Sequence, residues 1–205
     1  MNNLFCITIG RQLGSGGRKI GEMVAEKLKI SFYDKELLSI ASKESGLEKD
    51  FFERADERQA WSLFGITEYY SLNPLSGESL FVIQSDVIKK LSEERSCLFV
   101  GRCADYVLKD FHRRLDVFIS ADEADRILRI SDKMDISREK AKAVIEKTDK
   151  QRKSYYNYFT NKHWGRADSY HICINSSLMG AEATAEMICD RSEEHTSELQ
   201  SRLHL

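Results

Sequence analysis

One glycine-rich segment near the N-terminus constrains this chain more than any other feature. An apolar run beginning at Ile7 leads into the sequence Gly-Arg-Gln-Leu-Gly-Ser-Gly-Gly, and helix-forming residues follow from Arg18. Gly14, Gly16 and Gly17 can adopt positive φ and allow backbone N–H groups to approach an anion. The first turn of the following helix adds unpaired N–H donors and the positive end of the helix dipole. A strand, a glycine-rich turn and a helix in this order predict a site for phosphate groups.

The segment departs from the phosphate-binding loop motif G-x-x-x-x-G-K-[ST] in two respects. With Gly16 on the last glycine of the motif, Gly17 stands where the lysine belongs, and the hydroxyl position falls on a basic residue. We expect Arg11 or Arg18 to supply the missing positive charge and Ser15 to offer a hydroxyl. The residues predicted to hold the phosphates of a cofactor are Arg11, Gly14, Ser15, Gly16, Gly17 and Arg18. The sequence therefore favours nucleotide binding more strongly than catalysis.

Hydrophobic periodicity divides the chain into alternating strands and helices. Strands are expected at 4–10, 30–34, 97–101, 115–121 and 170–176. Helices are expected at 18–28, 35–45, 78–95, 122–132, 137–158 and 180–188. Strands that alternate with crossover helices form a parallel sheet, so the pattern predicts an α/β fold of three layers, α/β/α, with five strands. The ligand crevice of such a fold lies at the carboxyl ends of its strands.

Polar residues that directly follow the predicted strands are the first candidates for a site. Arg11 follows the first strand, Asp34 ends the second, and Arg102 and Asp105 follow the third. Because the carboxyl ends of parallel strands meet at one edge of a sheet, these side chains can converge there.

The helix expected after the fourth strand carries two arginines on one face. Arg126 and Arg129 are spaced i, i+3, so both can reach one side of a phosphate-filled cleft. The alternative is ordinary surface pairing, for example of Arg126 with Asp122.

Composition narrows the class of partner. The 205 residues, 41% of them hydrophobic, can build one core of ordinary size. A formal charge of -2 leaves no broad basic face, so small molecules are favoured as partners over nucleic acid. The absence of a long apolar run and of a signal peptide pattern predicts no membrane segment, which makes the cytoplasm the default location. Five cysteines without C-x-x-C spacing are expected to be reduced core residues, and no metal site is predicted.

The end of the chain differs from what precedes it. Residues 191–205 lose both the apolar periodicity and the turn signals, and the run RSEEHTSELQS resembles the translation of a sequencing-library adapter. We therefore expect residues 1–190 to form a single domain and residues 191–205 to be a non-native tail whose deletion leaves the protein stable.

Several motifs in a fixed order accompany the glycine-rich segment. They are FYDKE at 32–36, VGRCADY at 100–106, TDKQR at 148–152, YFTNKHWG at 158–165 and CINSS at 173–177. Together they resemble the cytidylate kinase-like family, which is related to the nucleoside monophosphate kinases. The resemblance covers roughly residues 4–190.

The resemblance implies a P-loop kinase fold with the strand order 2-3-1-4-5. It also implies an acceptor region inserted at about 44–80 and a mobile lid at about 122–168. The implied donor is ATP with Mg²⁺, and the implied acceptor is CMP or a similar monophosphate. In such in-line phosphoryl transfer, the protein mainly positions two nucleotides and neutralises charge on the migrating group.

Roles for individual residues follow from the positions that match. The resemblance assigns the acceptor side to Asp34, Arg102, Asp105 and Asp149. It assigns the catalytic cations of the lid to Arg126 and Arg152, and we add Arg129 because it shares a helix face with Arg126. The chain then departs from cytidylate kinase, since aromatic residues at 155–159 replace further arginines. These aromatics either cover a base or pack as a helix seam.

Two other classes of function remain open at this level. The missing loop lysine favours a nucleotide-binding sensor or regulatory module that has weak catalysis or none. A Rossmann oxidoreductase that binds NAD is a weaker alternative, because Asp34 lies about 20 residues after the glycines, where a ribose-binding acid belongs. Lys19 stands on the third glycine of that motif and argues against it.

Overall fold

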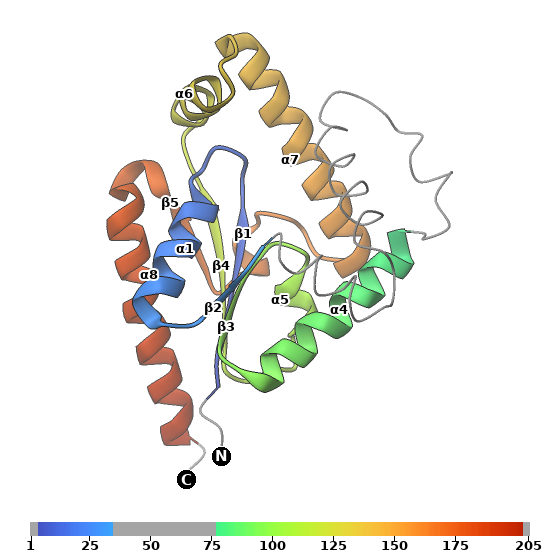
Figure 1. Cartoon of the computed structure of the whole chain (residues 1–205), viewed down its shortest axis with the longest axis vertical. Helices are drawn as coiled ribbons and strands as arrows, with labels where there is room; N and C mark the ends of the chain where they lie inside the picture. The colour runs from blue at the N-terminus through green and yellow to red at the C-terminus, as the bar shows by residue number, and fades with distance from the viewer. Residues whose placement is uncertain (1–3, 35–76, 203–205) are drawn as a thin grey trace.

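Five parallel strands form the sheet that organises the molecule (Figure 1). The computed structural model describes residues 4–34 and 77–202. The strands are β1 (Cys6–Arg11), β2 (Ser31–Tyr33), β3 (Cys97–Val100), β4 (Arg114–Ser120) and β5 (Ile172–Asn175). Their order is β2-β3-β1-β4-β5, which confirms the predicted order. It differs from the 3-2-1-4-5-6 order of the Rossmann fold, so the NAD-binding oxidoreductase is excluded.

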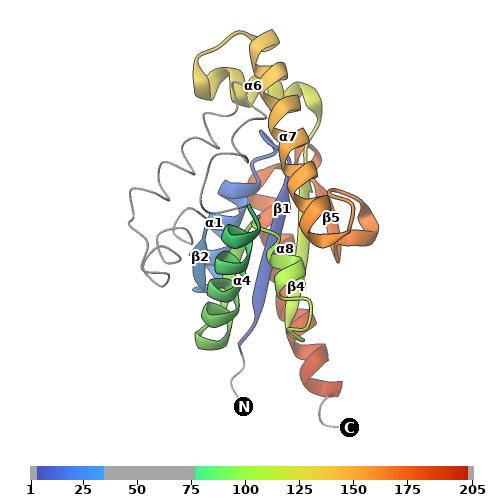
Figure 2. The same ribbon diagram turned by 90° about the vertical axis from the view of Figure 1, so that its right-hand side faces the viewer.

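One face of the sheet is covered by α1 (Gly17–Leu28) and α8 (Ser176–Arg202), which lie side by side in Figures 1 and 2. Helix α1 buries Ile20 and Val24, one turn apart, against the central strands. Helix α8 adds Ala185 and Ile188 to the same cluster. Burial of these aliphatic side chains contributes roughly 1.5–3 kcal/mol for each large one and fixes the start of α1 above β1.

The opposite face is covered by α4 (Gly77–Glu94) and the short α5 (Ala104–Val107). Val87, Ile88 and Leu91 of α4 pack with Phe99 of β3 in a second cluster. Helix α5 was not expected, because four residues are too few to show a helical period.

Two helices meet beyond the carboxyl ends of the strands, at the top of Figure 1, and the second runs from there down the right-hand side toward α4. They are α6 (Glu123–Met134) and α7 (Arg138–Thr160), and we call them the lid. Ser137 caps α7 by accepting a hydrogen bond from the Lys140 N–H, at 3.4 Å. A single turn of 3₁₀ helix, Ala167–Ser169, then leads into β5. None of the helices in the described part of the chain is long and apolar enough to cross a membrane.

The last helix differs most from the sequence expectation. A first helical turn begins at Ser176, where the Asn175 side chain accepts the Ser177 N–H at 3.0 Å, and a second helix begins after Gly180, close to the expected start. Gly180 interrupts the helix with φ 78° and ψ 174°. The expectation of a buried thiol was wrong for Cys173, which is exposed on the edge strand β5, whereas the other four cysteines are buried and free.

Helix α8 continues past the proposed domain boundary to Arg202. The Ser192 hydroxyl is buried and donates to the Cys189 carbonyl at 2.8 Å. The non-native origin of residues 191–205 stays a prediction. The acceptor region expected at about 44–80 and the helix expected at 35–45 lie outside the described residues, except for the first turn of α4.

Candidate functional site

The glycine-rich loop is anchored at both ends. Gln12, directly after β1, donates its N–H to the Ile119 carbonyl at 3.0 Å, and its side-chain oxygen accepts the Ala121 N–H at 3.3 Å. Gly14 and Gly16 have φ of 80° and 77°, the left-handed conformation expected from the sequence. The same expectation was wrong for Gly17, which is the first residue of α1 and does not have positive φ. Gly16 is the N-cap of α1 and has no side chain to bond the first N–H groups of the helix. The N-cap residue therefore places no side chain of its own over the helix N-terminus, which suits an anion.

Ser15 shapes the loop from inside. Its side chain is fully buried, and its hydroxyl donates to the Gln12 carbonyl at 2.9 Å and accepts the Gly17 N–H at 3.3 Å. Its carbonyl accepts the Ser176 hydroxyl at 2.7 Å. The hydroxyl expected to face a ligand is thus used within the protein.

Acidic and basic side chains meet where β1 and β2 end. Asp34 lies 3.7 Å from the Arg11 guanidinium and accepts the Arg18 Nε–H at 3.0 Å. Arg18 also pairs with Glu22 at 2.5 Å, and its guanidinium stands 5.7 Å from the centre of the Phe32 ring. The convergence of Arg11 and Asp34 agrees with the expectation from strand ends, and Arg18 joins them from α1.

Three arginines from three different segments lie close enough to affect one another's charge, and two of them, Arg11 and Arg152, also interact with Asp34. We call Arg11, Arg102 and Arg152 the arginine cluster. Arg152 Nη1 donates to the Arg11 carbonyl at 3.1 Å. Burial, together with the charges of Arg152 and Arg102, lowers the pKa of Arg11 to about 9, and Asp34 opposes this shift. Burial likewise lowers the pKa of Arg152, and the Arg102 charge adds to that effect. Cations held this close in a desolvated place favour an anionic ligand.

The backbone that carries Arg102 is unusual. Gly101, Arg102 and Cys103 have φ of 79°, 59° and 56°, so three consecutive residues are left-handed. For residues other than glycine, such a conformation costs roughly 1–3 kcal/mol and persists only where the surrounding structure enforces it. The turn after β3 therefore stores strain next to the arginine cluster, as functional sites often do.

The lid contacts the glycine-rich loop through the two members of a buried ion pair. Arg126 is 7% exposed, donates from Nε to the Leu13 carbonyl at 2.7 Å and pairs with Asp149 of α7. Asp149 in turn accepts the Leu13 N–H at 2.8 Å. Surface pairing of Arg126 with Asp122 is therefore not what the structure shows. Sequence reasoning did not find Leu13, because it takes part through its backbone.

Gly14 lies directly beneath the lid. A Cβ at position 14 would stand 2.8 Å from the Arg126 carbonyl, so only glycine permits this approach. Arg129 Nη1 donates to the Gly14 carbonyl at 3.1 Å, and this guanidinium is 3.9 Å from Asp125. The three proposed lid cations, Arg126, Arg129 and Arg152, thus all donate to backbone carbonyls within residues 11–14.

Asp105, expected on the acceptor side, is buried under the lid instead of joining the arginine cluster. It is 6% exposed and accepts the Tyr156 hydroxyl of α7 at 2.5 Å. Burial raises the pKa of Asp105 to about 6, against the opposing effect of the Tyr156 hydrogen bond. Its role on the acceptor side stays a prediction, and the contact it makes joins α5 to the lid.

Asp105→Asn should raise the thermal stability of the folded protein at pH 8 relative to wild type. The folded protein binds this proton more tightly than the unfolded chain, so the group stabilises the fold below pH 3.8 and this contribution is lost as pH rises through about 6. The difference should be about 3 kcal/mol at pH 8, because the pKa rises from 3.8 to about 6 and each pKa unit is worth about 1.4 kcal/mol. Thermal unfolding of both proteins from pH 4 to pH 8 measures it. A constant difference across that range would contradict the prediction.

The aromatic residues of the lid pack as a seam. Phe159 stacks on Phe81 of α4 with ring centres 4.4 Å apart, and Tyr156 lies 6.0 Å from Tyr170. Trp164 meets Phe118 of β4 edge to face at 5.2 Å. Of the two interpretations of the segment 155–159, the structure favours packing, although Tyr158 is 69% exposed.

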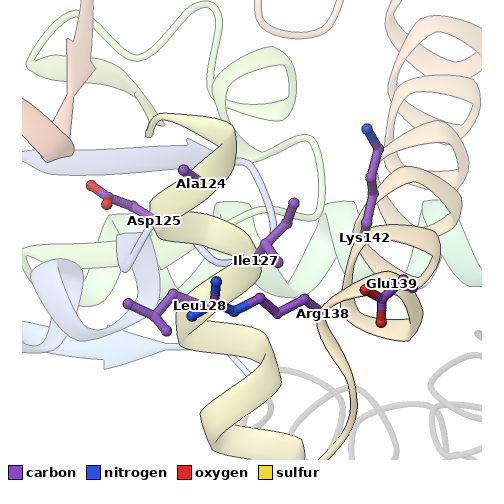
Figure 3. Close-up of a pocket in the computed structure, with 7 residues that line it drawn as sticks. All are labelled: Ala124, Asp125, Ile127, Leu128, Arg138, Glu139 and Lys142. Atoms are coloured by element: carbon purple, nitrogen blue, oxygen red, sulfur yellow. The ribbon is translucent and has the colours of Figure 1, made fainter.

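A hollow of about 460 Å³, which we call the outer hollow, lies between α6 and α7 (Figure 3). Its lining residues are Ala124, Asp125, Ile127, Leu128, Arg138, Glu139 and Lys142. None of them belongs to the predicted site, so the hollow is a feature of the lid itself.

Comparisons with known proteins place the chain in a family. Residues 6–178 match the model of the cytidylate kinase-like family, and the chain belongs to that family. It is accordingly a phosphotransferase with a P-loop kinase fold. A comparison with curated protein sequences found no match.

Solved structures agree on the fold. An uncharacterised protein from Eubacterium ventriosum is 26% identical with a TM-score of 0.71, and the match covers 92% of this chain and 98% of that one. A gluconokinase from Sinorhizobium meliloti is 12% identical with a TM-score of 0.53, covering 100% and 98%. A shikimate kinase from Bacteroides thetaiotaomicron is 14% identical with a TM-score of 0.50, covering 98% and 99%. At these low identities, the last two show the fold alone.

Proposed function

We propose that this protein transfers the γ-phosphoryl group of ATP to CMP or a similar nucleoside monophosphate. The observation that carries the proposal is the arginine cluster, which stands between the glycine-rich loop and the strained turn at Gly101. Donor phosphates at the loop and an acceptor phosphate at Arg102 would share this positive region. The cluster then neutralises the charge that develops as the phosphoryl group moves. We further expect the protein to act on free nucleotides in the cytoplasm.

On the donor side, we assign the phosphates of ATP to the N-terminus of α1. The left-handed conformations of Gly14 and Gly16, and the absence of a side-chain cap on the helix, support this assignment. Gly17 leaves room for the Arg11 side chain beside the first turn of α1, and Arg11 or Arg18 supplies positive charge. Ser15 holds the loop in shape from within.

On the acceptor side, we assign Arg102 to the phosphate of the monophosphate and Asp34 to its sugar or base. A guanidinium can hold a phosphate through two parallel hydrogen bonds. Asp149 and Asp105 remain candidates for this side only if the lid moves, since the lid contacts engage both carboxylates here.

Mg²⁺, which kinases of this kind use, fits the described residues poorly. Ser15 is committed to Gln12 and Gly17, and the following positions are basic. No group of three or more histidine, cysteine or carboxylate side chains suited to a metal occurs among the residues described. We therefore expect Mg²⁺ to arrive bound to the phosphates of ATP and to keep several waters, as this ion usually does.

The test is a direct assay of phosphoryl transfer. The protein is given ATP, Mg²⁺ and each nucleoside monophosphate in turn. Formation of the nucleoside diphosphate from that acceptor is measured. The proposal expects transfer to CMP or a close analogue above the rate without acceptor. Tight nucleotide binding with no diphosphate from any acceptor would replace the kinase with the sensor, the alternative that the missing loop lysine favours.

Arg102→Ala should weaken CMP binding by about tenfold to a hundredfold and leave ATP binding nearly unchanged. The reason is that a charge-assisted contact to phosphate contributes about 1.5–3 kcal/mol. Isothermal titration with each nucleotide separately measures both affinities. An equal loss for the two nucleotides, or no loss for either, would count against Arg102 as an acceptor residue.

A further inference from the structure

The side chain of Arg11 fills the space that a residue at position 17 would need. A Cβ at position 17 would stand 2.6 Å from the Arg11 Cβ and 3.2 Å from its Cγ. At the far end of the side chain, a Cβ at position 101 would stand 2.1 Å from Arg11 Nη1. Arg11 therefore runs from the end of β1 past Gly17 to the strained turn at Gly101. A side chain at position 17 or at position 101 would collide with Arg11, so both positions require glycine while Arg11 lies there.

This geometry links two departures from the phosphate-binding loop motif, one at position 11 and one at position 17. When Gly16 is placed on the last glycine of G-x-x-x-x-G-K-[ST], Arg11 falls on the first glycine and Gly17 on the lysine. The chain has thus exchanged glycine for a cation at one position and a cation for glycine at the other. The two positions touch in space, so a side chain at one excludes a side chain at the other.

The charge of Arg11 is only partly balanced within the described residues. Its ion-pair partner is Asp34 at 3.7 Å, and Arg18 holds the same carboxylate more closely at 3.0 Å. Arg18 is tied further to Glu22, and its side chain is 52% exposed, whereas that of Arg11 is 20% exposed. Of the two candidates for the missing cation, Arg11 is the one whose side chain is held between Gly17 and the turn at Gly101.

We propose that Arg11 replaces the loop lysine, and that its guanidinium binds the terminal phosphates of the donor nucleotide. This inference deepens the proposed function and rests on the same site. A guanidinium can hold two phosphate oxygens through two parallel N–H donors in a fixed plane, whereas an ammonium binds phosphate as a point charge. Arg11 is here a phosphate-binding residue that enters from the strand before the loop instead of from the helix after it.

The experiment removes the positive charge at position 11 and, in one variant, places it at position 17 instead. Wild type, Arg11→Met, Arg18→Met and the double variant Arg11→Gly/Gly17→Lys are titrated with ATP and with pyrophosphate, and their unfolding temperatures are recorded. Arg11→Met should weaken both ligands by about tenfold to a hundredfold, and Arg18→Met should weaken them less. The double variant restores the first glycine and the lysine of the motif, although Arg18 still occupies the hydroxyl position, and it should recover most of the lost affinity. Arg138→Met, a lid arginine in the outer hollow, serves as the unaffected control.

A folded Arg11→Met protein that binds ATP and pyrophosphate like wild type would overturn the inference, and so would a larger loss from Arg18→Met. If the double variant does not fold, Arg11→Lys decides, because retained charge should preserve more affinity than methionine does, and equal loss would refute the idea. These titrations do not depend on turnover. Loss and recovery of affinity without any diphosphate formation would support the role of Arg11 while refuting the kinase.

Discussion

Replacing Gly16 with valine should abolish measurable ATP binding while leaving most of the protein folded. Gly16 has φ 77°, and a side chain there would have room, since the nearest atom to its Cβ is 3.8 Å away on Ile20. The effect therefore comes from the left-handed conformation, which costs about 1–2 kcal/mol for a residue with a Cβ. It also comes from a branched side chain at the N-terminus of α1, where the phosphates would lie. Isothermal titration with ATP and thermal unfolding measure the two effects.

Gly180→Val provides the matched control for the Gly16 variant. Gly180 also has positive φ, at 78°, and no atom lies within 4 Å of the position of its Cβ. Its substitution should cost stability through the backbone and leave ATP affinity unchanged. Unchanged ATP affinity in a folded Gly16→Val protein would end the assignment of the donor phosphates to this loop.

Arg152→Ala should lower turnover by about a hundredfold and change the dissociation constant of ATP by much less. Arg152 lies in the arginine cluster, bonded to the Arg11 carbonyl, where charge on the migrating phosphoryl group would develop. Loss of an interaction made mainly in the transition state lowers kcat without a matching loss of binding. Steady-state kinetics and titration on the same preparation separate the two quantities. A comparable loss of ATP affinity would assign Arg152 to ground-state binding instead.

Arg126→Ala should combine the same catalytic loss with a loss of stability. The Arg126 and Asp149 side chains are 9% and 15% exposed, so removal of the arginine leaves a carboxylate without its partner beside Leu13. Breaking a buried pair costs about 3–5 kcal/mol. Arg138→Ala removes another lid arginine, in the outer hollow, and should affect neither quantity. A stable Arg126→Ala protein with wild-type turnover would show that the lid pair is dispensable.

The sequence was sufficient to predict most of the strands and helices, because the patterns that indicate them are local. Alternation of apolar runs with helical periods predicted all five strands to within two residues of their observed bounds, and the positive φ of Gly14 and Gly16 followed from residue type. The helical turn at 176–179, before Gly180, was not predicted, because Asn175 caps it through a side-chain contact that periodicity does not reveal. The four-residue α5 was too short to have a period.

What the sequence determined by itself was the α/β fold, the glycine-rich loop and the family, since each depends on residue types at fixed spacing along the chain. Only the tertiary structure decided how the charges are used. It buried Asp105 against Tyr156, bound Arg126 to Asp149 and the loop, and laid Arg11 across Gly17. These contacts join residues up to 136 positions apart, as between Leu13 and Asp149. Such pairings arise when strands and helices pack, so no local pattern encodes them.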